Sequence, residues 1–174
     1  MVVGNQLSAK PFLIQLIGEP GSGCRRLAFE FLKPLRRAAW MSPQWTLYAP
    51  LLWSIAQKNS IELLGLECQD RRRLRFLWKE LIRCKVFDAL ILENFRLTAG
   101  EGFFLQKLVT SLKSPIKVLV IDEKPHSFCS QRVHLSLSHQ SFRYVWSKGG
   151  DPTPRSVPFE FLKEIQSKEL PCLW

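Results

Sequence analysis

The sequence predicts an α/β domain: a mostly parallel central sheet, helices on both of its faces, and an antiparallel strand pair at its C-terminal edge. Two observations predict this class. Short apolar runs of strand length alternate with longer segments in which apolar residues recur every three or four positions, as on one helix face. The last two apolar runs follow one another across a short turn, which is typical of a hairpin. Strands that alternate with helices form a mostly parallel sheet covered by those helices.

The N-terminal half supplies the first elements of this pattern. The run PFLIQLIG at 11–18 predicts a buried strand. Residues 25–40 carry one apolar helical face with arginine and lysine opposite, and Pro34 should end or kink this helix because proline lacks a backbone N–H. The following elements are a strand with a proline-marked loop over 40–50, a short helix over 50–60 and a strand over 62–68.

The C-terminal half contains two helix-start signals. Asp70 is placed to cap a helix over 71–86, and Thr98-x-x-Glu101 forms a capping box before a helix over 101–113. Two buried strands are expected, each ending in a carboxylate, over 87–93 and 117–123. The terminal strand pair is expected over 134–138 and 142–147.

Composition excludes several classes of protein. The 174 residues are 46% hydrophobic, which excludes wholesale disorder, and no apolar run is long enough to span a membrane. Five cysteines and three histidines show neither a Cys-x-x-Cys pair nor a zinc spacing, so we expect reduced thiols in a cytoplasmic protein. The N-terminus also lacks the layout of a secretory signal. The net charge of +10 suggests an acidic partner such as nucleic acid, although charge alone is a weak signal.

We expect three regions along the chain. Residues 1–148 form the core, 149–158 a Gly/Pro-rich linker, and 159–174 an amphipathic C-terminal tail. The end of the tail, with Leu170, Leu173 and Trp174, is a candidate partner-binding segment, because aromatic residues are enriched in protein interfaces. The alternative is a tail that packs on its own domain.

A glycine-rich segment separates the first strand from the first helix. Gly18, Gly21 and Gly23 stand where a phosphate-binding loop of the pattern G-x-x-x-x-G-K-S/T would lie. In that motif, backbone N–H groups cradle phosphate at the helix N-terminus. Here Gly18 and Gly23 have the motif's spacing and Ser22 lies between them. The alternative interpretation is a tight strand-to-helix turn.

The two chemically essential positions of that motif are replaced. Cys24 stands where the lysine would contact the outer phosphates, and Arg25 stands where a hydroxyl would hold Mg²⁺. We therefore expect no productive hydrolysis of Mg·ATP and no cofactor. Cys24 is either a reactive thiol at a helix N-terminus or a plain buried thiol.

NTPases of this type also need an acid at the end of an apolar strand, which holds the metal through water. Glu93 and the pair Asp122-Glu123 both follow such strands. The alternative for each is a core strand with an acid at its solvent end.

From about Leu7 to Pro158, the order of these features resembles the RecA-like ATPase core, and more closely the bacterial ImuA group of damage-inducible mutagenesis proteins. Residues 39–41 resemble the second strand of the core, and residues 61–64 resemble the family's D-x-L-L-type strand entry. The helix at 71–85 followed by FDALILE resembles the family's helix and Walker B strand. The segment FRYVWSKGGDPTPRSVPF resembles the C-terminal close of ImuA-type proteins.

The resemblance implies a RecA-like three-layer domain in which Glu93 is the Walker B counterpart. Gln44 falls about where a RecA ATPase carries its catalytic glutamate. The N-terminal strand and helix through which RecA subunits polymerise have no counterpart in this sequence, so we expect no ATP-driven filament. The implied partners are an ImuB-like Y-family polymerase homologue and an error-prone polymerase.

Three functions remain as hypotheses. The first is a non-catalytic interaction module for translesion mutagenesis in the SOS response to DNA damage. The second is a DNA-binding repair or recombination protein, and the third is a residual P-loop NTPase. The candidate DNA contacts are basic residues in four parts of the chain: Arg36, Arg37, Arg71, Arg72, Arg73, Arg75, Lys124 and Arg132.

Overall fold

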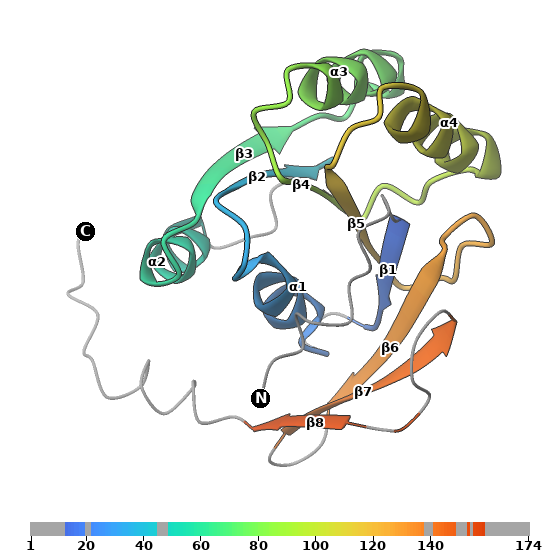
Figure 1. The fold of residues 1–174 in the computed structure, drawn as a ribbon. Helices are drawn as coiled ribbons and strands as arrows, with labels where there is room; N and C mark the ends of the chain where they lie inside the picture. Colours follow the sequence, from blue (N-terminus) through green and yellow to red (C-terminus); the bar gives the residue numbers. More distant parts are fainter. Residues whose placement is uncertain are drawn as a thin grey trace.

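The computed structural model describes residues 13–19, 22–44, 49–137, 141–148, 153 and 155–158, which include one eight-stranded sheet (Figure 1). In spatial order the strands are β3 (Glu62–Glu67), β2 (Arg37–Ser42), β4 (Ala89–Glu93), β5 (Lys117–Asp122), β1 (Leu13–Ile17), β6 (Gln131–Leu137), β7 (Ser141–Lys148) and β8 (Arg155–Pro158). The first six strands in this order are parallel, and β7 and β8 are antiparallel to their neighbours. The predicted fold class, including the antiparallel pair β6–β7, is confirmed.

Four helices among these residues cover the two faces of the parallel strands (Figure 1). The helices α1 (Cys24–Leu32) and α2 (Ala49–Lys58) lie on one face, and α3 (Arg71–Arg83) and α4 (Ala99–Ser111) lie on the other. Strand β4 shows why both faces need cover. Its side chains alternate between the two cores, with Ala89 and Ile91 in one and Leu90 and Leu92 in the other. No helix in the described part of the chain is long and apolar enough to cross a membrane.

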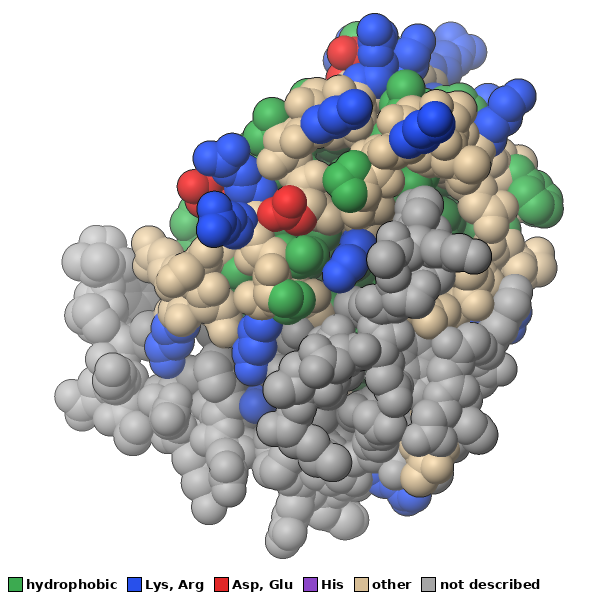
Figure 2. All heavy atoms as spheres, viewed as in Figure 1, with side chains coloured by type: hydrophobic (Ala, Val, Ile, Leu, Met, Phe, Trp, Pro, Cys, Tyr) green, Lys and Arg blue, Asp and Glu red, His purple; other side chains and the backbone are tan. Residues whose placement is uncertain are grey.

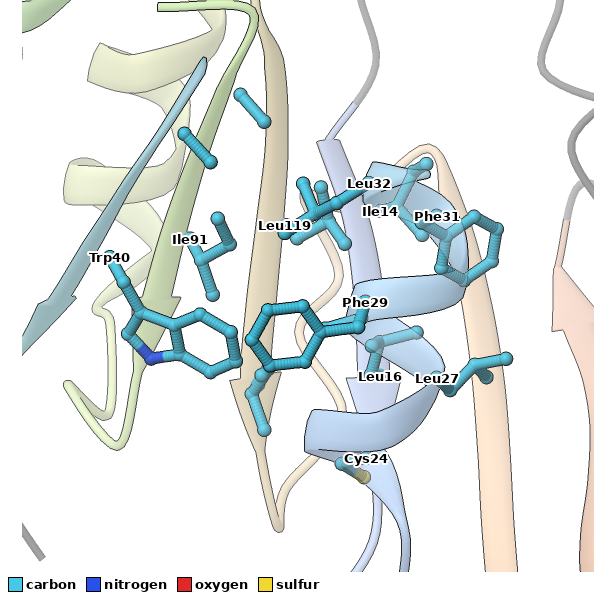
Figure 3. Packing of buried hydrophobic residues seen from close by; sticks show 14 of the residues in the cluster. Ile14, Leu16, Cys24, Leu27, Phe29, Phe31, Leu32, Trp40, Ile91 and Leu119 are labelled. Carbon is cyan, nitrogen blue, oxygen red and sulfur yellow. The ribbon is translucent and has the colours of Figure 1, made fainter. Parts of the chain in front are cut away.

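The first core lies between α1 and the sheet (Figure 3). The ring of Phe29 lies 5.4 Å from that of Trp40, and Leu119 and Ile91 lie beside them. Trp40 is fully buried. Burial of each such side chain contributes roughly 1.5–3 kcal/mol, so this core fixes the position of α1 on the sheet.

Both predicted helix caps are confirmed. The Asp70 carboxylate accepts a hydrogen bond from the Arg72 backbone N–H at 2.8 Å. Thr98 and Glu101 form the reciprocal capping box, with Glu101 accepting from the Thr98 N–H at 2.8 Å. Burial raises the pKa of Glu101, but the Thr98 hydrogen bonds and nearby arginine charges outweigh burial and hold the pKa below its usual range.

The expectation that Pro34 ends the helix is confirmed, and the part of the expected helix that follows Pro34 is not helical. Helix α1 ends at Leu32, and the chain re-enters the sheet as β2 at Arg37. Pro34 is the physical reason, because it cannot donate a helical hydrogen bond and its ring clashes with the preceding turn. The apolar residues after Pro34 therefore become a strand that is buried from Ala38 to Ser42.

Strands β6 and β8 also differ from the expectation. Strand β6 begins at Gln131 rather than 134. Residues 155–158, which the Gly/Pro-rich pattern places in a linker, form β8, where Val157 pairs with Phe142 of β7. Its proline content is compatible with a strand because β8 lies at the edge of the sheet, where a missing backbone donor is tolerated. The tail residues 159–174, including Leu170, Leu173 and Trp174, lie outside the described residues.

Candidate functional site

A cavity of about 460 Å³ lies at the carboxyl ends of β1, β4 and β5. In open α/β sheets, ligands bind beyond the carboxyl ends of the strands, so this is the expected place for a site. Its lining comes from the loop between β1 and α1, the start of α1, and the ends of β4 and β5: Gly18, Glu19, Gly23, Cys24, Arg25, Glu93, Asn94, Ile121, Asp122 and Glu123.

The glycines of the loop are required by its geometry. Gly23 immediately precedes α1 with φ of 93°, a left-handed conformation that favours glycine. A Cβ added to Gly18 would lie 2.2 Å from the Ser22 hydroxyl oxygen, so the loop closes tightly on itself. Gly18, Ser22 and Gly23 thus lie at the strand–helix junction where the sequence places them, while Gly21 lies outside the described residues.

Cys24 is a buried thiol rather than an activated one. It is only 6% exposed, and its sulfur lies 3.3 Å from the Ser22 hydroxyl. Burial raises the pKa of the Cys24 thiol, and the nearby Glu93 carboxylate raises it further. The position that would carry the phosphate-binding lysine is therefore neutral.

Arg25 occupies the space between the loop and the end of β4. Its Nε donates to Oε1 of Glu93 at 2.6 Å. The second oxygen of Glu93 accepts from the indole N–H of Trp40 at 3.0 Å. Both oxygens of this carboxylate are therefore engaged by protein groups, and the Glu93 side chain is only 4% exposed.

The second candidate acid, Asp122, holds the next loop in place. One carboxylate oxygen accepts from the Glu123 N–H at 2.8 Å, and the other lies 3.0 Å from Nε2 of His126. Gln15 supports the same loop from β1, because it accepts from the His126 N–H and donates to the Lys124 carbonyl. Asp122 therefore has a structural role at this edge.

The residues of the cavity do not fit a magnesium-bound nucleotide. Among the lining residues, four carboxylates face one guanidinium, so a polyphosphate meets more negative than positive charge. The guanidinium lies where a hydroxyl ligand of the metal would be needed, and it would repel a divalent cation.

The structure does not bring the eight candidate DNA contacts together. Arg36 and Arg37 stand at the amino end of β2, and Arg37 donates to Glu62 at 2.6 Å. Lys124 follows the carboxyl end of β5, at the opposite edge of the parallel sheet. Arg132 lies on β6. These positions form no single basic surface.

Most of the candidate contacts at the start of α3 are engaged within the protein. Arg71 pairs with Glu101 at 3.1 Å, and Arg73 pairs with Asp70 at 3.6 Å. The guanidinium of Arg75 lies 5.7 Å from the centroid of the Phe104 ring. Arg72 forms no ion pair with a described carboxylate. Arg71 and Arg75 therefore join α3 to α4, and Arg73 pairs with the N-cap of its own helix.

Three residues of this edge were missed from the sequence. Trp40 binds Glu93, and Gln15 and His126 order the loop after β5. A tryptophan or a glutamine inside an apolar strand indicates a core position. No sequence spacing links Trp40 to Glu93 or Gln15 to His126. Gln44, the expected counterpart of a catalytic glutamate, is exposed just after β2, and its carbonyl accepts from Ser42 at 2.8 Å.

Comparison with known proteins identifies the fold. No protein-family model matches the sequence, and neither does any curated protein. Among solved structures, the crystal structure of the RadB recombinase matches with a TM-score of 0.65 at 13% sequence identity. The match covers 84% of this chain and 86% of the recombinase chain. At this identity the similarity shows the fold, which is a RecA-like core.

Proposed function

We propose that this RecA-like chain is a non-catalytic accessory protein of the DNA damage response, and that it acts as an interaction module without nucleotide turnover. The observation that carries the proposal is the Arg25–Glu93 ion pair. In a RecA-like ATPase, the acid at the end of this strand and the hydroxyl that follows the loop lysine share a metal ion. Here a guanidinium lies between the loop and that acid.

The ion pair stabilises the loop without a ligand. A carboxylate as buried as Glu93 is costly unless it is paired, and Arg25 and Trp40 pair it from two sides. The internal cation thus supplies positive charge where an ATPase needs a divalent ion. A domain built in this way holds its strand–loop–helix frame in the absence of nucleotide, as an interaction platform requires.

Restoring the two missing groups tests this proposal. The double variant Cys24→Lys/Arg25→Thr returns the lysine and the hydroxyl to the loop and frees Glu93. We expect the wild-type protein to bind no fluorescent ATP analogue in the presence of Mg²⁺, and the double variant to gain measurable binding. The single variant Cys24→Lys is the matched control, because it adds a lysine while the arginine stays in the metal position. Equal magnesium-dependent binding by the wild type and the double variant would contradict the proposal.

The finer assignment, an ImuA-like role in translesion synthesis, is supported by the resemblance described for residues 7–158. It predicts binding to an ImuB-like Y-family polymerase homologue and to an error-prone polymerase. The RadB recombinase match is compatible with a role near DNA repair and recombination. Co-purification with a polymerase homologue from damaged cells, compared with a chain truncated before residue 159, tests both the partner and the tail. Recovery of no polymerase-like protein with the full chain would contradict the assignment.

A further inference from the structure

The outward side of α3 and α4 has the features of a docking surface, and the candidate site does not explain it. The two helices pack side by side through Arg71 with Glu101 and Arg75 with Phe104. Phe76 on α3 is 63% exposed and Phe103 on α4 is 59% exposed. Each of these rings points away from the buried side of its own helix.

The outward face of α3 combines this ring with positive charge. Arg72, Phe76, Lys79 and Arg83 follow one another at spacings of four, three and four residues, which places them on one stripe of the helix. The buried residues Leu74, Trp78 and Ile82 occupy the opposite side. Over its whole length α3 carries six basic residues and one acid. Figure 2 shows the resulting group of lysine and arginine side chains over α3, at the top of the view.

Helix α4, which packs beside α3, exposes a similar pair of side chains. Lys107 follows Phe103 by four residues, so the two side chains are neighbours on its exposed face. Lys79 and Lys107 form no ion pair with a described carboxylate, and neither does Arg72. We define the outward face of α3–α4 by Arg72, Phe76, Lys79, Phe103 and Lys107.

We infer that this outward face docks an acidic protein segment that also carries apolar side chains. Two exposed aromatic rings are suited to anchor a partner, because aromatic residues, phenylalanine included, are enriched in protein interfaces. The unpaired cations around them favour an acidic partner and exclude a basic one.

The face is better suited to protein than to nucleic acid. A nucleic-acid footprint carries charge of one sign that is free to neutralise phosphates. Here the exposed carboxylates of Asp70 and Glu80 lie among the basic side chains of α3. Arg71, Arg73 and Arg75 already contact other groups of the protein. Mixed charge around apolar anchors is typical of a protein interface. The inference deepens the proposed interaction role, and it holds even if the cavity proves to bind nucleotide.

A labelled synthetic peptide is the probe for this surface. It is an amphipathic helix with leucine on one face and glutamate along both flanks, and its binding is measured by fluorescence anisotropy at two salt concentrations. Two comparison probes separate the contributions: the same peptide with glutamine for every glutamate, and a single-stranded oligothymidylate. We expect the acidic peptide to bind with a dissociation constant of roughly 10–100 μM and both other probes to bind at least about tenfold more weakly.

Variants then locate the binding. Phe76→Ala/Phe103→Ala should weaken peptide binding at least about tenfold, because each ring would lose the apolar area that it buries against the peptide. The matched control is Trp53→Ala, which removes an exposed aromatic from α2 on the other side of the sheet and should leave binding unchanged.

A second pair of variants tests the charges. Lys79→Gln/Lys107→Gln should weaken binding and flatten its salt dependence, whereas Lys33→Gln/Lys58→Gln removes the same charge from the α1–α2 side and should do neither. The inference is overturned if the acidic peptide does not bind, or if it binds equally to the face variants and their controls. It is also overturned if the oligonucleotide binds more tightly and the face variants abolish that binding.

Discussion

The Arg25–Glu93 ion pair has a matched control in the same molecule. The Arg37–Glu62 pair has the same Nε–Oε distance of 2.6 Å, but the Glu62 side chain is 71% exposed whereas that of Glu93 is 4% exposed. Substituting either arginine with alanine removes the same chemical contact. Only Arg25→Ala leaves a buried carboxylate without its cation.

The magnitude follows from burial. Removing one partner of a fully buried pair costs about 3–5 kcal/mol. Arg25 itself is 41% exposed, and solvent partly screens the pair, so we expect a loss of about 2 kcal/mol for Arg25→Ala. For a domain of this size, that loss lowers the melting temperature by about 4–8 °C. Arg37→Ala should unfold at the wild-type midpoint.

Chemical denaturation in urea, followed by tryptophan fluorescence, measures both variants. The double variant Arg25→Ala/Glu93→Gln adds a further comparison, since it removes the buried charge together with its partner. Its loss should be smaller than the sum of the two single losses, with a coupling of at least about 1 kcal/mol. Equal midpoints for Arg25→Ala and Arg37→Ala, or additive effects in the double variant, would refute the view that this pair anchors the loop.

Three other outcomes are expected. Gly23→Ala should destabilise the protein by about 1 kcal/mol, because the φ of Gly23 is left-handed. Gly100→Ala is the control and should be neutral or stabilising, because an added Cβ there meets open space. Equal losses of stability in thermal melts of the two variants would contradict this expectation. The pKa of Glu101 is lowered on folding from the ordinary glutamate value of 4.5, so its contribution to stability is complete above that value and is lost as pH falls below it. Glu101→Gln should therefore flatten the stability–pH curve in this acidic range. Buried Cys24 should react with a thiol reagent at least about tenfold more slowly than exposed Cys84, and mass spectrometry of labelled peptides would show the reverse order if the thiol were activated.

Local sequence signals predicted most of the fold. The caps at Asp70 and Thr98 depend on residues within three positions of each other, so the sequence alone reveals them. The parallel sheet followed from strands that are apolar on both faces. Pro34 marked the end of the first helix, but the apolar residues that follow it carry no local signal that separates a helix from a strand, and their burial in the sheet made them β2.

The site was less predictable because its contacts are distant in sequence. The glycines and the strand-terminal acid mark the edge of the sheet, but Arg25 and Glu93 are 68 positions apart and Trp40 and Glu93 are 53. The order of strands in the sheet brings these groups together, and no local pattern carries that order. The sequence could therefore show that a lysine and a hydroxyl were missing. It could not show that an arginine bridges to the acid.

Wild-type protein titrated with ATP and Mg²⁺, with unfolding temperature as the readout, tests the central claim most directly. A ligand present at a hundredfold excess over its dissociation constant stabilises the folded state by about 2.7 kcal/mol, which a melting curve detects easily. We predict no shift in the melting temperature at any nucleotide concentration, with or without the metal. A saturable, magnesium-dependent increase in the melting temperature would contradict the account, because the Arg25–Glu93 ion pair would have to break before Glu93 could bind the metal ion.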